Sequence, residues 1–478
     1  MNTFTALYPL LSVVVGALVV LLLEVFLKRE NRDYLALISI LFLLNAGREC
    51  IRVWNRGYTY FDGNLQLDNL ALLLCLILTL TTLFVILISM KYLRLQNVNL
   101  GEYYALLLFA LSGMIIMVSS TDLLIIFLGL EVLSMSSYAL AGLKTEDVRS
   151  TEAAVKYFLL GSFASAFLVF GLAFLYGAAH SLYIPSIVNF FRTDTSLSLM
   201  ALAGLGFVII GFGFKIAWVP FHMWTPDVYE GSPTPITAFF SVGPKVVGFA
   251  VLIRLFQLYW AESLNSQVVS SALWVIAVLT MVAGNLLALR QRNVKRILAY
   301  SSIAHAGYLL VALLAEDNSG LVFYLFVYLF MNIGAFTAVI ALSKKDTEYL
   351  DLEDFKGIGF RYPWIGATLS VFLFSLAGFP PTGGFLAKFY IFASAVHGGY
   401  IWLVIIGVLA SLISVYYYLR IVVYMYMHPA SHDIEIDAYN PALFLVLFLC
   451  LYGVLQMGLF PGNVLLIIKQ AVASLPIF

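Results

Sequence analysis

The sequence has 478 residues, of which 62% are hydrophobic and 11% are charged, and its 26 basic and 26 acidic residues cancel. No basic block is present, which excludes nucleic acid as a partner. Apolar runs of about 20 residues, each long enough to span the hydrocarbon of a bilayer, recur throughout the chain. The composition therefore predicts an all-α polytopic membrane protein.

We predict about fourteen transmembrane spans. In chain order they cover residues 5–27, 34–52, 68–90, 103–119, 122–143, 153–178, 201–219, 234–258, 271–289, 297–315, 320–343, 364–396, 401–426 and 441–470. The twelfth span contains GFPPTGG at residues 378–384, which must break it into two half-helices.

The loops between the spans are short, so we expect a single membrane domain. Its predicted parts are a three-helix segment at 1–100, a first repeat at 101–260, a second repeat at 268–428 and a C-terminal helix at 438–478. No GxGxxG follows a predicted strand and no P-loop is present, so a soluble nucleotide or flavin module is not expected.

Lysines and arginines are divided unequally between the two sets of loops. When residues near the end of a span are counted with the adjacent loop, 16 of the 26 lie on the side of the loops after odd-numbered spans and 6, Arg254 among them, lie on the other side. The remaining 4, Lys156, Lys215, Lys245 and Lys388, are assigned to the spans themselves. Cytoplasmic loops are enriched in these residues, so both termini are predicted to lie on the non-cytoplasmic side. Arg48, Arg52 and Arg56 are the main exception, and a misplaced second span would explain them.

The stretch 211–245 twice places a lysine close to a proline inside an apolar span. Lys215 comes five residues before Pro220, and Lys245 directly follows Pro244. Proline frees a backbone carbonyl, and a charge at mid-membrane costs about 2.5–3.5 kcal/mol on insertion scales. Each of the two sites therefore combines a buried charge with an unpaired backbone carbonyl. This costly combination, which occurs twice, indicates a function inside the membrane.

The two broken spans, the seventh and the twelfth, are five spans apart. Because five is odd, two five-helix units made of spans 4–8 and 9–13 would run in opposite directions across the membrane. Inverted repeats with broken helices in matching positions are typical of transporters. The architecture therefore favours transport, although it does not identify the cargo.

Glu131, His305 and Lys388 also lie within predicted spans. With Lys215 and Lys245 they would leave about two excess positive charges in a low dielectric, so at least one lysine should be neutral at a time. A chain of such groups can store and pass protons. Two structural alternatives stay open: a static Glu131–Lys215 ion pair, and a hydrogen-bonded core histidine at 305.

Other polar and aromatic residues have simpler explanations. Lys156 lies four residues after Glu152 at the start of a span, as in an ion pair on a helix surface. His428 and His432 are four apart, but Pro429 between them disrupts a common helical face, so we predict no metal site. We assign the excess of tyrosine and phenylalanine mostly to lipid-facing packing and interfacial belts.

Several segments resemble the N-type subunits of bacterial respiratory complex I. They are PFHMWTPDVYEGSPTPITAFFSVGPKVVGFAVL at 220–252, NVKRILAYSSIAHAGYLL at 293–310, and 349–392, which begins YLDLEDFKGIGF and ends FLFSLAGFPPTGGFLAKFYIF. The resemblance covers nearly the whole chain. The wider antiporter-like family shares the PFH-W-PD pattern and the GFPP break, whereas VYEGSPTP favours the N type over L-type, M-type and Mrp relatives.

The resemblance implies that five buried groups translocate protons: Glu131, Lys215, Lys245, His305 and Lys388. It pairs Glu131 with Lys215 and makes Lys245 the connection to the second half of the chain. Lys388 stands where some relatives carry glutamate. His222, at the helix break, and Lys156 are further candidates.

The resemblance also implies a translocase subunit of an NADH:quinone oxidoreductase, in which quinone reduction in other subunits drives proton movement. FMN, iron–sulfur clusters and the quinone site would belong to those subunits, so no cofactor is expected in this chain. The expected partners are M-type and K-type neighbours, the lateral helix of the L-type subunit, and the lipid of the bacterial inner membrane. An Mrp-type cation/proton antiporter subunit without redox coupling and a passive scaffold are the alternatives.

The loop charges give a test of orientation. A reporter fused after Phe478 should be active only if it functions outside the cytoplasm, because the basic residues concentrate in the opposite set of loops. Activity of a reporter that works only in the cytoplasm would contradict the predicted topology.

Overall fold

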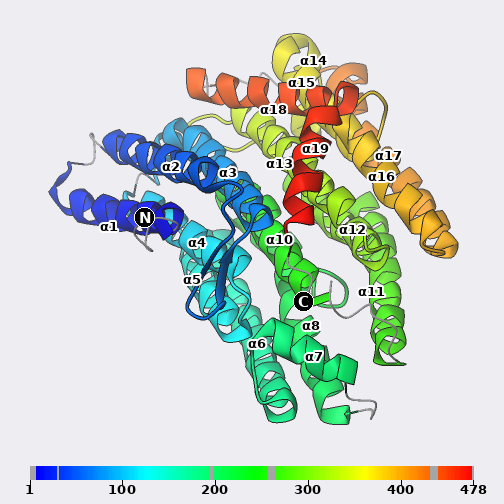
Figure 1. Ribbon diagram of the computed structural model, residues 1–478. Coiled ribbons are helices and arrows are strands. Elements are labelled where there is room, and N and C mark those ends of the chain that lie inside the picture. Colours follow the sequence, from blue (N-terminus) through cyan, green and yellow to red (C-terminus); the bar gives the residue numbers. More distant parts are fainter. Residues whose placement is uncertain are drawn as a thin grey trace.

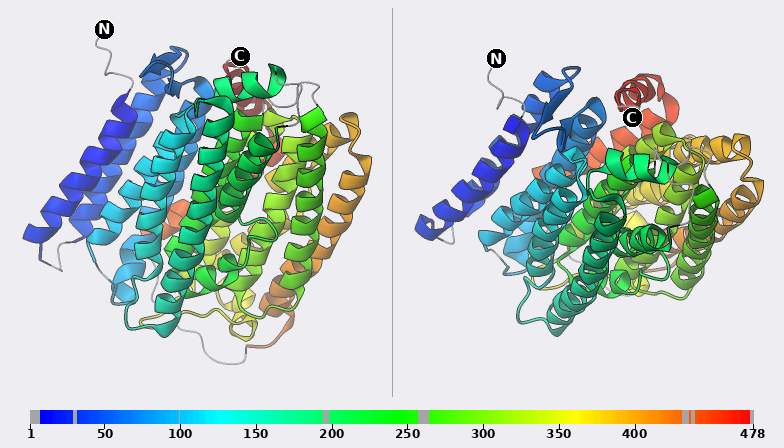
Figure 2. Two further views of the ribbon diagram at one scale, coloured as in Figure 1. Left: turned by 90° about the horizontal axis from the view of Figure 1, so that it is seen from below. Right: turned by 60° about the horizontal axis from the view of Figure 1, so that its bottom comes forward.

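The computed structural model describes residues 7–28, 32–98, 100–193, 198–256, 264–430, 436 and 440–475, most of them in helices. Of the described helices, 13 are long and apolar enough to cross a membrane, which confirms the all-α polytopic class. In the left view of Figure 2 the long helices stand side by side, from α1 at one edge to α17 at the other.

The elements follow one another along the chain as labelled in Figure 1. They are α1 (Tyr8–Phe26), α2 (Asp33–Val53), β1 (Tyr58–Tyr60), β2 (Leu65–Leu67), α3 (Asn69–Leu95), α4 (Glu102–Ser119), α5 (Leu123–Ala141), α6 (Val148–Ala179), α7 (Ile184–Thr193), α8 (Leu199–Ile216), α9 (Trp224–Gly231), α10 (Thr234–Phe256), α11 (Leu264–Leu289), α12 (Val294–Leu314), α13 (Asn318–Ala341), η3 (Leu352–Phe355), α14 (Ile358–Arg361), α15 (Pro363–Ala377), α16 (Gly383–His397), α17 (Ile401–Met427), α18 (Pro441–Leu459) and α19 (Gly462–Ala473).

The twelfth span is broken where the sequence predicts. α15 ends at Gly378, whose φ of +94° is accessible to glycine without strain. The Phe379 N–H then donates to the Phe374 carbonyl at 2.9 Å, a bond typical of a Schellman ending. α16 resumes after Pro380 and Pro381.

The seventh span ends in the same way. Ala217, just after α8, has a φ of +66°, and the Trp218 N–H donates to the Gly213 carbonyl at 3.1 Å. A proline, Pro220, again follows before the chain resumes helix in α9. The two breaks therefore share one C-terminal motif, while the opposite orientation of spans 4–8 and 9–13 stays a prediction.

The bounds predicted for the last span are wrong, and the explanation offered for Arg48, Arg52 and Arg56 fails. The last span does not continue to residue 470, because the chain leaves the helix at Phe460, just before Pro461, and α19 is a separate helix. The second span is not misplaced, since α2 covers Asp33–Val53. Its Arg52 forms an ion pair with Glu49 at 2.5 Å. The exception that the arginines near the end of α2 make to the loop-charge bias therefore has another cause.

Two further elements were not predicted from the sequence. β1 and β2 form a hairpin in which Tyr58 pairs with Leu67, and α7 is an amphipathic helix of 10 residues. Both are too short to be distinguished by an apolar run of spanning length.

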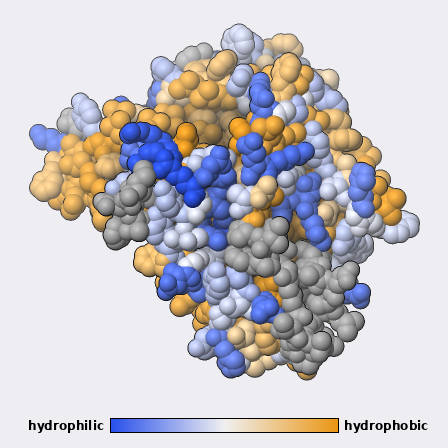
Figure 3. All heavy atoms as spheres, in the orientation of Figure 1, coloured by the Kyte–Doolittle hydropathy of each residue, from blue (hydrophilic) through white to orange (hydrophobic). Residues whose placement is uncertain are grey.

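Three helices form the centre of the bundle. Every residue of α10 is buried, as are nearly all those of α12 and α13. By contrast, α1, α6 and α17 expose many large apolar side chains, as a lipid-facing surface requires. Figure 3 shows one face, with hydrophobic atoms gathered over the α1 edge and hydrophilic atoms towards the middle.

A buried ion pair anchors the end of α10. Arg254 binds the Asp68 carboxylate at 2.8 Å, and the two side chains are 5% and 6% exposed. The same Asp68 accepts from the Ala71 N–H at 2.7 Å and so begins α3. Arg254, counted above among the loop residues, is therefore an internal residue that joins α3 to α10.

The break in the twelfth span depends on a close approach of its two halves. A Cβ at Gly384 would lie 1.9 Å from the Ser375 carbonyl oxygen, so Gly384→Ala should destabilise the chain by about 1–3 kcal/mol. We expect less chain in the membrane and a lower temperature of inactivation. Gly206→Ala is the matched control, because no atom lies within 4 Å of the added methyl group. Equal behaviour of the two variants would contradict this account.

Candidate functional site

The first two predicted groups lie close to each other but do not touch. Glu131 on α5 accepts a hydrogen bond from Ser165 on α6 at 2.6 Å. Lys215, at the end of α8, donates to Ser134 at 3.0 Å and to the Tyr157 hydroxyl at 3.5 Å. Among the contacts of the described residues no ion pair joins the two, so the static-pair alternative lacks its defining contact.

A small cavity connects the surroundings of these two groups. Its volume is about 10 Å³, and its lining includes Ser134, Ser165 and Lys215. This volume is at the lower limit for one water molecule. The serine that binds Glu131 and Lys215 thus line the same small cavity.

Aromatic rings fill the region between Lys215 and the next lysine. Tyr157 stacks on Trp224 at 4.5 Å, and the Trp224 indole donates to the Phe214 carbonyl at 2.9 Å. Trp224 in turn packs against Tyr229, with ring centroids 6.4 Å apart. The part of this region next to Lys215 is therefore densely packed with aromatic rings. Hydroxyl groups that lead to Lys245 begin at Tyr229.

Lys245 lies in a second polar cluster at the centre of the bundle. Its amine donates to the Ser302 hydroxyl on α12. The same hydroxyl accepts from Tyr328 of α13 at 3.0 Å and lies 3.3 Å from the Tyr229 hydroxyl of α9. One serine thereby gathers groups from four helices around Lys245.

His305 continues this cluster one turn further along α12. Its Nδ1 lies 2.6 Å from the Tyr324 hydroxyl, and its Nε2 lies 3.3 Å from the Tyr418 hydroxyl of α17. Tyr418 also forms a hydrogen bond with Ser301. Both ring nitrogens thus have partners, and each partner is a hydroxyl that can donate or accept.

Lys388 completes the series at the helix break. Its amine donates to the carbonyls of Leu376 and Ala377, at 2.9 and 3.0 Å, and to the Ser411 hydroxyl at 2.8 Å. The two carbonyls are at the end of α15, where intrahelical partners are missing and a positive charge is favoured. The amine also lies 4.9 Å from the centre of the Tyr308 ring, which packs against His305.

The three lysines of this series are 2–5% exposed and the histidine is 1% exposed, so all four side chains are internal. The two further candidates lie elsewhere. His222 is in the loop between α8 and α9, and its Nδ1 has no hydrogen-bond partner among the described residues. Lys156 forms the predicted ion pair with Glu152 at 2.7 Å, and it also binds Asp227 at 2.6 Å.

Sequence reasoning missed the tyrosines that surround the buried chain. The tyrosines with less than 2% exposure include Tyr157, Tyr229, Tyr308, Tyr324, Tyr328, Tyr417 and Tyr418. Assigning the aromatic excess mostly to lipid contact was therefore wrong for this group. The pair Tyr324 and Tyr328, one turn apart on one span, was a usable signal, since a buried phenol needs a hydrogen-bond partner.

Metal chemistry finds no support in the described residues. No group of three or more histidine, cysteine, aspartate or glutamate side chains is placed there to hold a metal ion. His432, considered above with His428, lies outside the described residues.

The sequence has close relatives among curated proteins. Residues 120–414 match the family described as NADH:quinone oxidoreductase/Mrp antiporter, TM. The chain is 44% identical over 456 residues to NADH-quinone oxidoreductase subunit N of Trichlorobacter lovleyi, an alignment that covers 95% of this chain and 93% of the relative.

Solved structures show the same fold. A chain of respiratory complex I from Thermus thermophilus matches with a TM-score of 0.83 and 32% identity, over 96% of this chain and 98% of that one. A chain of the Mrp complex from Dietzia matches with a TM-score of 0.82 over 99% and 98% of the two chains, but it is only 19% identical, so that likeness concerns the fold alone.

Proposed function

Because the chain belongs to the NADH-quinone oxidoreductase subunit N family, an antiporter-like family of respiratory complex I, we propose that it translocates protons through its buried polar chain. Quinone reduction in other subunits drives this movement. The redox groups and the quinone site belong to those subunits, and this chain contributes the membrane path.

One observation carries the proposal: protonatable side chains follow one another through the middle of the bundle. They begin at Glu131 and Lys215, continue with Lys245 and His305, and end at Lys388. Lysine, histidine and glutamate change charge by gaining or losing a proton, and hydroxyl groups between them both donate and accept. Such residues inside a membrane segment mark an ion or proton path.

The partners of the lysines suit groups whose charge changes. Lys215, Lys245 and Lys388 bind hydroxyl or carbonyl oxygens and no described carboxylate. If all were charged with Glu131, the interior would hold an excess of positive charge, which low dielectric strongly disfavours. We therefore infer that the lysines are protonated in turn, so that protonation of one disfavours protonation of the next.

The alternative functions have less support. A passive scaffold would not require several lysines inside the bundle that have no carboxylate partner among the described residues. An Mrp-type antiporter subunit shares the fold at 19% identity, whereas the curated relative at 44% identity is a subunit N. Co-purification separates these functions, because FMN and iron–sulfur partners, with M-type, K-type and L-type neighbours in the inner membrane, identify a redox-driven complex.

Lys215 tests the path in the first half of the chain. Lys215→Ala should leave assembly intact, because alanine is easier to bury than lysine, while proton pumping and coupled NADH oxidation fall about tenfold or more. Lys215→Arg should not restore pumping, because guanidinium does not release its proton at working pH. Normal pumping by the arginine variant would remove deprotonation of Lys215 from the mechanism.

Glu131 tests whether its charge serves the same step as Lys215. Glu131→Gln keeps the shape and removes the charge, so it should impair pumping nearly as much as Lys215→Ala, and Glu131→Asp should be milder. Because one step is affected, the double variant should be hardly worse than either single variant. A static ion pair predicts the opposite: each single change strands a buried charge and lowers assembly, and removing both restores it. Membrane content and pumping of the singles and the double decide between these outcomes.

A further inference from the structure

The outer face of α2 changes from apolar to basic along its length. Its exposed apolar side chains are spaced three or four residues apart, at Tyr34, Leu37, Leu41 and Leu44, and each is 48–66% exposed. This spacing places them on one side of the helix. Arg48 follows four residues later and is exposed on the same side, and one turn further Arg52 has a side chain that is 37% exposed.

The basic end of this face carries an excess of positive charge. Arg56, three residues after the end of α2, is exposed as well, whereas Glu49 is buried against the bundle and binds Arg52. Residues 45–67 hold three arginines and two acids, Glu49 and Asp62, so one positive charge remains when all five are ionised. Anions that approach the end of α2 are therefore attracted to it.

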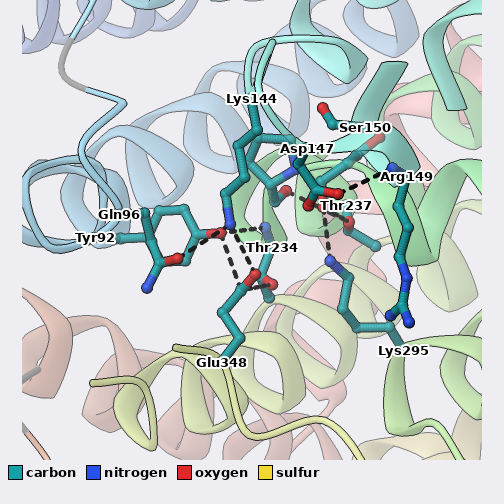
Figure 4. A network of polar contacts seen from close by, with 12 residues as sticks. Tyr92, Gln96, Lys144, Asp147, Arg149, Ser150, Thr234, Thr237, Lys295 and Glu348 are labelled. Carbon is teal, nitrogen blue, oxygen red and sulfur yellow. Dashed lines mark hydrogen bonds and ion pairs between the residues drawn. The ribbon is translucent and has the colours of Figure 1, made fainter. Parts of the chain in front are cut away.

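Cations that point into the bundle are bound within the chain, and the outer face of α2 is different. Lys144 binds the Glu348 carboxylate at 3.0 Å, and these side chains are 15% and 12% exposed. Glu348 also accepts a hydrogen bond from the Tyr92 hydroxyl of α3 at 2.9 Å, and Figure 4 shows it where these side chains meet. Arg48, by contrast, has no ion-pair partner among the described residues.

The change from leucine to arginine falls at the depth where a lipid leaflet changes from hydrocarbon to headgroup. From Leu37 to Arg48 the helix rises about 16 Å, close to half of the 30 Å or so of hydrocarbon in a bilayer. The Arg52 guanidinium lies 5.4 Å from the centre of the Tyr8 ring at the start of α1, and tyrosine is typical of the membrane–water interface. Figure 3 shows hydrophilic atoms directly beside the hydrophobic α1 edge.

We propose that the outer face of α2 binds an anionic phospholipid of the leaflet predicted to be non-cytoplasmic. Its phosphate group binds the guanidinium groups of Arg48 and Arg56, and its acyl chains lie along Leu37, Leu41 and Leu44. Guanidinium groups bind phosphate oxygens through paired hydrogen bonds, and long basic side chains reach from the edge of the hydrocarbon to the headgroups.

The shape of this face favours a lipid over other anions. A water-borne anion would contact the arginines and leave the apolar stretch beside them without a partner. A phospholipid is apolar over the length of one leaflet and charged at its end, as this face requires. Such a ligand also explains why arginines gather on the side of the membrane where basic residues are few. The lipid site goes beyond the proposed function, because no step of proton movement depends on it.

Photoreactive lipids test the site in the complete membrane complex. Phosphatidylglycerol that carries a diazirine in its acyl chain is added to the complex in lipid nanodiscs, and after illumination the modified peptides are identified by mass spectrometry. We expect modification of α2 at Leu37, Leu41 and Leu44. Phosphatidylcholine with the same chains has no net charge and should modify these residues at least about threefold less.

Two variants separate the arginine site from the general charge of this end of the bundle. Arg48→Gln/Arg56→Gln should reduce modification by phosphatidylglycerol to the level of phosphatidylcholine, and it leaves the Arg52–Glu49 pair in place. Lys469→Gln is the matched control, because Lys469 is an exposed cation of α19 at the same end. It should keep the preference for phosphatidylglycerol.

Four results would overturn the lipid site. The first is equal modification of α2 by both lipids in the unaltered chain, which requires no variant to assemble. The second is a full preference for phosphatidylglycerol in Arg48→Gln/Arg56→Gln. The third is an equal loss of preference in Lys469→Gln, because the effect would then follow total charge. The fourth is the absence of modification at Leu37, Leu41 and Leu44 by either lipid, because another protein would then cover this face. None of these results depends on proton pumping, so the proposed function stands or falls separately.

Discussion

The low dielectric of the membrane interior decides which partner each cation receives. At the centre, Lys215, Lys245 and Lys388 are bound by hydroxyl and carbonyl oxygens, which satisfy an amine without adding a charge. Towards the ends of the bundle, Lys144 and Arg254 are bound by carboxylates. A carboxylate partner fixes a positive charge, whereas a neutral oxygen lets the amine exist with or without its proton. Fixed charges thus surround an interior whose charge can change.

The helices are arranged to protect that interior. α10, α12 and α13 are buried on all sides, so the groups they carry are shielded from lipid and solvent alike. On α12, Ser302 and His305 find hydrogen-bond partners on α9 and α17. Tyrosine is well suited to this region, because its ring fills space in an apolar core and its hydroxyl joins a polar chain.

Much of this could be predicted from the sequence, for identifiable reasons. The spans, the break at 378–384 and the lysines inside spans follow from hydropathy and from the cost of burying charge. The roles of Ser302 and Glu348 could not be predicted, because their partners come from other helices at long sequence separation. Serines are also common in membrane spans, and Glu348 follows two lysines in a loop, so nothing local distinguishes either residue.

Lys388 has a double role that limits how position 388 can evolve. Its amine satisfies the last carbonyls of α15, so the residue proposed to change protonation is also the residue that caps the broken helix. A glutamate there would direct acceptor oxygens at acceptor carbonyls, and α15 would have to end differently to accommodate it. Adaptation of position 388 is therefore tied to the backbone around it, and a change of chemistry there requires compensating changes in the turn.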